Sequence, residues 1–155
     1  ALKYNTKPSK NLLMKIIEKT INHRFKIRSY HPLASNLGHT FGHAIEKMSN
    51  FKVLHGDAIS IGTVIALKFA LQENIINKGV FNDIVLKMKK LKLKTESNVK
   101  YDKTQWVELM LKDKKSYDSY IGLILIKDIA KPFRKGKLPY FYVKKEKMIQ
   151  FFENQ

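Results

Sequence analysis

The sequence contains no cysteine in its 155 residues, so disulfide bonds and cysteine-ligated zinc sites are excluded. Any metal site must therefore use histidine and carboxylate side chains. Acidic residues are also scarce, with 13 Asp and Glu against 30 Lys and Arg, which gives a formal net charge of +17. Glycine (7) and proline (4) are too few for a fibrous or low-complexity chain, whereas hydrophobic residues make up 44% of the sequence, enough to build a core. These values predict one globular domain.

Long apolar runs are absent as well. The nearest, Ile59 to Leu71, is shorter than the roughly 20 residues that a membrane span needs, and it contains Lys68. The first residues include Lys3 and Lys7 but no apolar stretch of the kind found in signal peptides. The sequence therefore predicts a cytoplasmic protein with no membrane partner.

The excess of positive charge has two interpretations. Lysines can neutralise the phosphates of nucleic acid and release counterions, so a basic helical nucleic-acid-binding module is one of them. However, the lysines are spread along the chain, and arginine, the usual reader of bases, is nearly absent. One aromatic and basic cluster, formed by Tyr140, Phe141, Tyr142, Lys144 and Lys145, could stack on bases, but packing of this segment in the core is favoured. Nucleic acid is thus the less favoured partner.

Apolar residues recur at helical spacing through most of the chain. The predicted helices cover Ser9–Ile27, with Ser9 as N-cap, and Gly38–Ser49, Gly56–Asn74, Val80–Leu93, Thr104–Lys112 and Lys145–Glu153. Two segments, Tyr120–Ile126 and Leu138–Val143, are rich in Ile or aromatic residues and predict strands. The fold class is therefore predicted as mainly α-helical, a single domain over residues 1–155 with at most a small β-hairpin.

Three of the five histidines lie close together in the segment NLGHTFGHAIEKMSNFKVLHGDAISIG. On a helix, His39 and His43 share a face with Glu46, and two imidazoles at this spacing can reach one divalent ion. Such a pair can equally be two surface or core histidines. His55 follows after a short loop, at the start of the next predicted helix, whose N-terminus is suited to an anion.

Small residues favour convergence of these histidines. Stripes of small side chains on the two predicted helices allow the helices to approach closely; they are formed by Gly38 and Gly42 on one helix and by Ala58, Gly62, Ala66 and Ala70 on the other. We expect close packing to bring His55 toward the face that carries His39 and His43.

These residues resemble the signature of 3-dehydroquinate synthase and related sugar-phosphate cyclases. The family typically reads LNxGHTxGHAIE and LHGEAVxIG, and here NLGHTFGHAIE precedes LHGDAISIG. The segment KDKKSYDSYIGLILIKDIAKP, residues 112–132, resembles the DKK segment of the family and the strand that follows it. The resemblance runs from the first predicted helix to Pro132 and implies a helical C-terminal domain of the dehydroquinate synthase-like fold.

The resemblance implies roles for individual residues. His39 and His55 fall on metal ligands for Zn²⁺ or Co²⁺, and His43 falls on a histidine that assists departure of the substrate phosphate. Asn36 and the pair Lys114 and Lys115 fall on phosphate-binding positions. The family's substrate-binding lysine in the first helix corresponds to Arg24.

The resemblance also implies a reaction. The family uses NAD to oxidise a ring alcohol of a phosphorylated sugar transiently, eliminates phosphate, reduces the ketone again and closes a carbocycle, so the net activity is that of a lyase. A metal ion polarises the carbonyl and acidifies the adjacent C–H bond, while cationic side chains stabilise the leaving phosphate. Homodimers are common in the family, which makes a second copy a further expected partner.

Three departures from the family pattern matter. The residues before the first helix contain no Gly-rich NAD-binding unit, and they do not match the family's third metal ligand, a glutamate. This chain by itself is therefore expected to bind no NAD and to be inactive. The NAD-binding domain is expected as its missing partner. Pro32 stands where an arginine usually binds the substrate carboxylate, which favours a relative that uses a carboxylate-free sugar phosphate, such as 2-deoxy-scyllo-inosose synthase, as the alternative to 3-dehydroquinate synthase. Asp57 replaces the usual glutamate.

Overall fold

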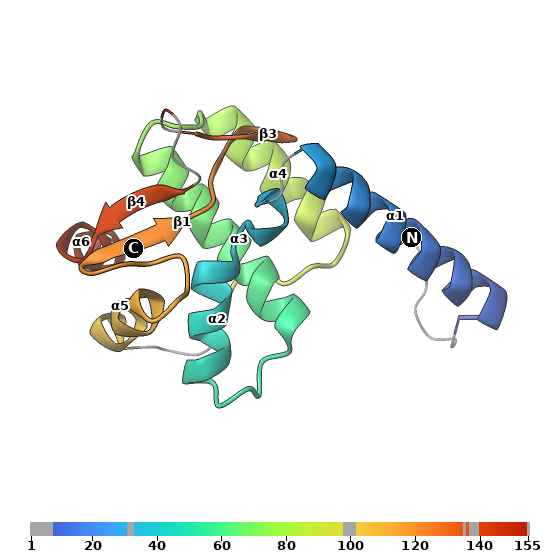
Figure 1. Ribbon diagram of the computed structural model, residues 1–155, viewed down its shortest axis with the longest axis horizontal. Helices are drawn as coiled ribbons and strands as arrows, with labels where there is room; N and C mark the ends of the chain where they lie inside the picture. Colours follow the sequence, from blue (N-terminus) through green and yellow to red (C-terminus); the bar gives the residue numbers. More distant parts are fainter. Residues whose placement is uncertain (1–7, 31–32, 98–101, 135, 137–139, 155) are drawn as a thin grey trace. The chain divides into compact units, whose positions relative to one another are not determined.

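The computed structural model describes residues 8–30, 33–97, 102–134, 136 and 140–154. It falls into two compact units, residues 1–35 and 36–155, which are described separately below. The mainly helical fold class is confirmed: helices form most of the described chain (Figure 1). The prediction that residues 1–155 act as a single metal- and substrate-binding domain stays a prediction. No helix of the described residues combines the length and the hydropathy that crossing a bilayer requires.

The first unit consists mainly of helix α1, Lys10–Tyr30. Ser9 caps it as predicted, since its hydroxyl oxygen accepts a hydrogen bond of 3.3 Å from the Leu12 amide. The helix is amphipathic, and its apolar stripe is exposed; the stripe is formed by Leu12, Leu13, Met14, Ile16, Ile17, Ile21 and Phe25. Arg24 lies on the same helix and is exposed.

The second unit is built on the pair of helices α2, His39–Met48, and α3, His55–Gln72, which lie side by side (Figure 1). Helix α4, Lys78–Lys90, packs against α3, and α5, Lys103–Leu111, packs against α2. The C-terminal helix α6, Lys145–Glu153, packs against α5. The short 3-10 helix η1, Ala34–Asn36, precedes α2 and joins the two units.

Polar side chains set the starts of two of these helices. The Asn77 side chain accepts a hydrogen bond of 2.9 Å from the Val80 amide, so α4 begins at Lys78, two residues before the predicted start. The Asp102 side chain likewise accepts from the Gln105 amide at 2.6 Å and caps α5. A side-chain oxygen at the N-cap satisfies one of the amide groups that a helix start leaves without a partner.

The strands form two small antiparallel sheets. In the first, β1, Tyr120–Leu123, pairs with β4, Phe141–Lys144, with Gly122 opposite Tyr142. In the second, β2, Ile126–Asp128, pairs with β3, Lys131–Pro132. The sequence predicted a single hairpin and no strand at β3. Residues 138–139 of the second predicted strand lie outside the described residues.

The core of the second unit lies between α2, α3, α5, α6 and β1. Its largest fully buried side chains are Phe41, Ile45, Leu67, Phe69, Val107, Met110, Ile121, Leu123, Leu125, Met148 and Phe151. Val143 is buried and Phe141 packs against this core, so the predicted core role of the strand holds for these two residues. The ring of Tyr142 instead contacts the ring of Tyr140 and that of the exposed Tyr117.

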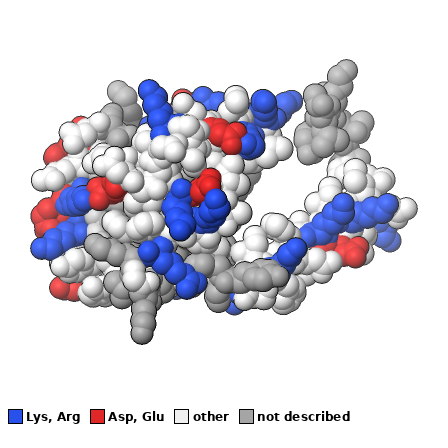
Figure 2. All heavy atoms as spheres, turned by 90° about the horizontal axis from the view of Figure 1, so that it is seen from above, with Lys and Arg blue, Asp and Glu red and all other residues white. Residues whose placement is uncertain are grey.

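Lysines are distributed over the surface, and several of them have acidic partners. On the face shown in Figure 2, Lys and Arg side chains form separate groups, several of them beside Asp or Glu. Ion pairs at 2.5–2.8 Å include Lys94 with Asp57, Lys131 with Asp128 and Lys147 with Glu73. Such pairing is typical of a solvated surface rather than of a surface that binds nucleic acid.

Candidate functional site

Helices α2 and α3 approach each other closely because glycines lie between them. A Cβ atom placed on Gly62 would lie 2.3 Å from the carbonyl oxygen of Gly38 and 2.7 Å from the amide nitrogen of Gly42. Gly38 also has a φ of +76°, in the left-handed region that favours glycine, immediately before α2. The predicted close packing of the two small-residue stripes is therefore confirmed.

This packing brings three imidazoles together, two from the start of α2 and one from the start of α3. The ring centroids of His39 and His43 are 5.4 Å apart, those of His39 and His55 are 5.6 Å apart, and those of His43 and His55 are 6.2 Å apart. The expected convergence of His55 on the face of His39 and His43 is thus confirmed.

Each of the three imidazoles uses its Nδ1 atom for a hydrogen bond. The partner of His39 is the Leu37 carbonyl oxygen, at 3.2 Å, and that of His55 is the Glu46 carboxylate, at 3.0 Å. His43 pairs with the Asp113 carboxylate at 3.0 Å. Carbonyl and ionised carboxylate oxygens only accept hydrogen bonds, so all three Nδ1 atoms carry the proton. A ring in its neutral form with this tautomer keeps a lone pair on Nε2.

The electrostatic setting favours the neutral form of His39. Burial lowers the pKa of His39, and the neighbouring His43, His55 and Lys115 lower it further, whereas the hydrogen bond to Leu37 acts in the opposite direction. A neutral imidazole with a free Nε2 lone pair is the form that binds metal ions. A carboxylate behind a ligating histidine, as Glu46 lies behind His55, is a common way to fix the ring and its tautomer.

Asp113 and Lys115 lie beside the imidazoles in the turn that follows α5. The Lys115 ammonium lies 2.5 Å from the Asp113 carboxylate, and the two side chains are only 2% and 5% exposed. Burial alone would raise the pKa of Asp113, but hydrogen bonds from the side chain and amide of Lys115 and from His43 outweigh it and lower the pKa below its usual value. Lys114, in contrast, is exposed. The structure therefore separates the two lysines that the sequence treated as a pair.

The other predicted site residues lie as follows. Asn36 is half-buried at the end of η1, two residues before Gly38. Asp57, in the first turn of α3, forms an ion pair with Lys94 at 2.8 Å. Pro32, which replaces the arginine of the family pattern, lies outside the described residues.

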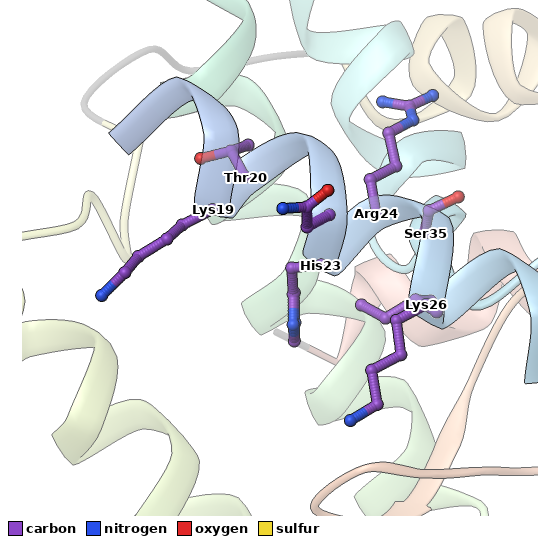
Figure 3. Close-up of a pocket in the computed structure, with 8 residues that line it drawn as sticks. Lys19, Thr20, His23, Arg24, Lys26 and Ser35 are labelled. Carbon is purple, nitrogen blue, oxygen red and sulfur yellow. The ribbon is translucent and has the colours of Figure 1, made fainter. Parts of the chain in front are cut away.

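Arg24 belongs to the first unit, where it lines a hollow along α1 (Figure 3). Lys19, His23 and Lys26 line the same hollow together with Thr20, Asn22, Ile27 and Ser35. The Arg24 side chain extends to one side of the helix, and those of His23 and Lys26 extend to the other. The cationic side chains that line the hollow therefore do not converge on one point.

The donor set can be compared with what a divalent ion needs. Among residues 8–30, 33–97, 102–134 and 140–154, the structure has no group of three or more His, Asp or Glu side chains arranged to hold a metal ion. His39 and His55 supply two neutral nitrogen donors, whereas a catalytic zinc site usually has three protein ligands. The described residues therefore supply only part of the donor set that such a zinc site needs.

Two residues of the site were not assigned by the sequence. Glu46 was recognised on the face of His39 and His43 but not as the partner of His55, although its place within GHAIE offered a signal. Asp113 was passed over between lysines in KDKK, and its partner His43 is 70 residues away in the chain. Each of the two carboxylates is hydrogen-bonded to an imidazole of the cluster.

Comparison with known proteins identifies the family. The family described as 3-dehydroquinate synthase C-terminal matches residues 9–116, more than two thirds of the chain. The chain therefore belongs to the 3-dehydroquinate synthase C-terminal family. The 3-dehydroquinate synthase of Endomicrobium trichonymphae is 36% identical over 122 residues, which make up 77% of this chain and 31% of that protein.

Solved structures of sugar-phosphate cyclases share the fold. A 2-deoxy-scyllo-inosose synthase complexed with carbaglucose-6-phosphate, NAD⁺ and Co²⁺ superposes with a TM-score of 0.66 at 23% identity, covering 77% of this chain and 34% of that one. ValA, a 2-epi-5-epi-valiolone synthase from Streptomyces hygroscopicus subsp. jinggangensis 5008 with NAD⁺ and Zn²⁺ bound, gives 0.63 at 15% identity, covering 93% and 39%. The chain thus spans about a third of the length of its relatives.

Proposed function

We propose that this chain supplies the metal- and phosphate-binding part of a 3-dehydroquinate synthase-like lyase. The reaction is NAD- and divalent-metal-dependent elimination of phosphate from a sugar phosphate, followed by closure of a carbocycle, as in the shikimate pathway. The observation that carries the proposal is the cluster of three imidazoles, with ring centroids 5.4–6.2 Å apart, in which each Nδ1 atom is hydrogen-bonded to an oxygen acceptor.

His39 and His55 would hold Zn²⁺ or Co²⁺ through Nε2. When bound, the ion supplies Lewis-acid polarisation of the substrate carbonyl. His39 contributes a neutral ring because burial lowers its pKa, and Glu46 fixes the orientation of His55. A third ligand must come from outside the described site, and the family pattern assigns it to a glutamate in a region that this chain does not match.

The phosphate group of the substrate would lie near His43 and Lys115. The buried ammonium of Lys115 lies close enough to the cluster to lower the pKa of His39, so its charge acts on the same region. His43 could exchange a proton with the leaving phosphate through Nε2. The exposed Lys114 and the half-buried Asn36 would contribute further contacts, and Arg24 would bind another part of the substrate.

NAD would bind mainly to a partner domain, in accordance with the family pattern. When bound, it supplies reversible hydride transfer, so the net reaction remains a lyase reaction. This chain alone is therefore expected to show no turnover. A cytoplasmic location and assembly as a homodimer belong to the same proposal.

A second candidate is a cyclase that acts on a carboxylate-free sugar phosphate, as 2-deoxy-scyllo-inosose synthase does. The specific observation in its favour is Pro32, which removes the positive charge that the family pattern places opposite a substrate carboxylate. Arg28 or Arg24 could compensate for that charge, and the match to the 3-dehydroquinate synthase C-terminal family keeps 3-dehydroquinate synthase as the first candidate.

A chimera tests the proposal. The part of the Endomicrobium trichonymphae enzyme that precedes its matched segment is fused to this chain, and phosphate release is measured with NAD and Co²⁺ on the carboxylated substrate of 3-dehydroquinate synthase and on glucose 6-phosphate. Release from the first substrate supports the first candidate, and release from the second alone supports the second. The proposal fails if a folded chimera that binds NAD and Co²⁺ releases phosphate from neither, or if its His39→Ala variant is as active as the parent.

A further inference from the structure

One carboxylate, Asp113, contacts His43, the imidazole of the cluster that is not an expected metal ligand. Asp113 Oδ2 accepts from His43 Nδ1 at 3.0 Å, and Asp113 Oδ1 accepts from both the side chain and the amide of Lys115, at 2.5 and 3.0 Å. The Asp113 side chain is 5% exposed, so water competes little for these bonds. Its two oxygens are thus divided between two different partners.

The surrounding turn fixes this carboxylate in place. The Ser116 hydroxyl donates to the Met110 carbonyl oxygen and accepts from the Gly122 amide, which ties the turn to both α5 and β1. A Cβ atom on Gly122 would lie 2.3 Å from the Lys115 carbonyl oxygen, so only glycine lets β1 pack this closely on the turn. Thr40, next to His39 on α2, donates to the Gly122 carbonyl oxygen at 2.9 Å. The turn therefore has a fixed position relative to the imidazoles.

We infer that Asp113 is a positioning residue, which holds His43 in the Nδ1–H tautomer and thereby presents the Nε2 lone pair of His43 to the imidazole cluster. The Lys115 ammonium neutralises the carboxylate and occupies its other oxygen, so Asp113 cannot rotate away from His43 without losing two hydrogen bonds. The inference rests on the proposed function only for what the His43 Nε2 atom then does to a phosphate.

The Asp113→Asn variant tests this sharply because the amide has only one accepting oxygen. Two donors from Lys115 point at Oδ1, so the amide oxygen is expected to stay there and the NH₂ group to face His43. That group donates, so His43 must accept at Nδ1 and move its proton to Nε2. The variant should therefore invert the tautomer of His43, while the side chain at position 113 keeps its volume and its neighbours.

The measurement is ¹⁵N NMR of the histidine side chains in the 155-residue chain at pH 8, where an ordinary imidazole is neutral. In the unaltered chain, the His43 signals should show a proton on Nδ1, and in Asp113→Asn a proton on Nε2, while His39 keeps its own pattern. Glu46→Gln is the matched control: it should alter His55 and leave His43 unchanged. Circular dichroism shows whether each variant is folded.

Two results would overturn the inference: an Nε2–H tautomer of His43 in the unaltered chain, which needs no variant to fold, or a folded Asp113→Asn chain in which His43 keeps its Nδ1 proton. In the active chimera, the same variant should lower kcat by about 10²-fold, the low end for a proton-transfer group, with KM changed little. Since the NMR experiment contains no substrate, metal or NAD, its outcome is independent of whether the proposed reaction is correct.

Discussion

The contact between α2 and α3 makes Gly62→Ala the most informative single change. The added Cβ would lie 2.3 Å from the Gly38 carbonyl oxygen and 2.7 Å from the Gly42 amide nitrogen, where ordinary contacts begin near 3.4 Å. Both are backbone atoms, so no side-chain rotation relieves the clash and the helices must separate by about 1 Å. Overpacking of this kind costs about 1–3 kcal/mol of the free energy of unfolding.

Gly56→Ala provides the matched control on the same helix. A Cβ atom at Gly56 meets nothing within 4 Å, so this variant keeps only the gain in helix propensity that any Gly→Ala change brings, up to about 1 kcal/mol. The difference between the two variants therefore isolates the clash. In a thermal unfolding experiment, Gly62→Ala should melt below Gly56→Ala by roughly 2–4 °C for each kcal/mol.

The same displacement reaches the candidate metal site, because His39 and His55 begin the two helices that must separate. We expect Gly62→Ala to weaken Co²⁺ binding by about tenfold or more, the effect seen when the support of a metal ligand is lost, and Gly56→Ala to leave it unchanged. If Gly62→Ala were as stable as Gly56→Ala and bound Co²⁺ equally well, the close approach of the helices would not be what assembles the site.

Further predictions concern the buried ion pair, the metal ligand and the surface charge. Lys115→Met should lower the free energy of unfolding, measured in urea, by about 3 kcal/mol, the lower end for a broken buried pair because two other donors still reach Asp113. Lys114 is exposed, so Lys114→Met should change the free energy of unfolding by less than about 0.5 kcal/mol. Similar losses in the two variants would contradict the difference in burial. Because the pKa of Asp113 is lowered, its stabilising contribution is present above pH 4 and is lost as pH falls through its folded-state pKa. The difference in the free energy of unfolding between the parent chain and Asp113→Asn should therefore become smaller from pH 6 to pH 2. A difference that stays constant over this range would refute the prediction. His39→Ala should weaken Co²⁺ binding, measured by absorbance spectroscopy, by more than about tenfold. An unchanged affinity for Co²⁺ would exclude His39 as a ligand. Finally, any association with DNA should be weak and lost in moderate salt, and tight binding that survives such salt would revive the nucleic-acid interpretation.

The helical part of the fold could be predicted from apolar spacing, because α2 to α6 bury apolar side chains and α1 shows the same spacing although its apolar stripe is exposed. The structure places a helix in every segment so predicted, and the ends differ by a few residues where a local polar contact decides. The Asn77 cap moves the start of α4, and α1 continues three residues beyond Ile27. The second sheet was missed because β3 contains only Lys131 and Pro132, too short a segment to show a period.

The imidazole cluster was predictable for a different reason. The stripes around Gly42 and Gly62 indicate close packing directly in the sequence, and the histidines stand at the helix ends that this packing joins. No comparable local pattern encodes Asp113 or distinguishes Lys115 from Lys114. Their difference depends on β1, where Gly122 admits the Lys115 backbone, and this contact forms only when distant segments meet.

The two carboxylates of the cluster, Glu46 and Asp113, contact different imidazoles because they lie on different elements. Glu46 lies on α2 with His39 and reaches across to His55 on α3, so it couples the two expected metal ligands to each other. Asp113 belongs to the turn after α5 and couples His43 to a buried cation instead. His43 is therefore linked through Asp113 to Lys115, whose charge would meet a phosphate. His39 and His55 belong to α2 and α3, the two helices that would hold the metal. A change in one anchor should leave the other imidazole pattern intact, which is why Glu46→Gln and Asp113→Asn can serve as controls for each other.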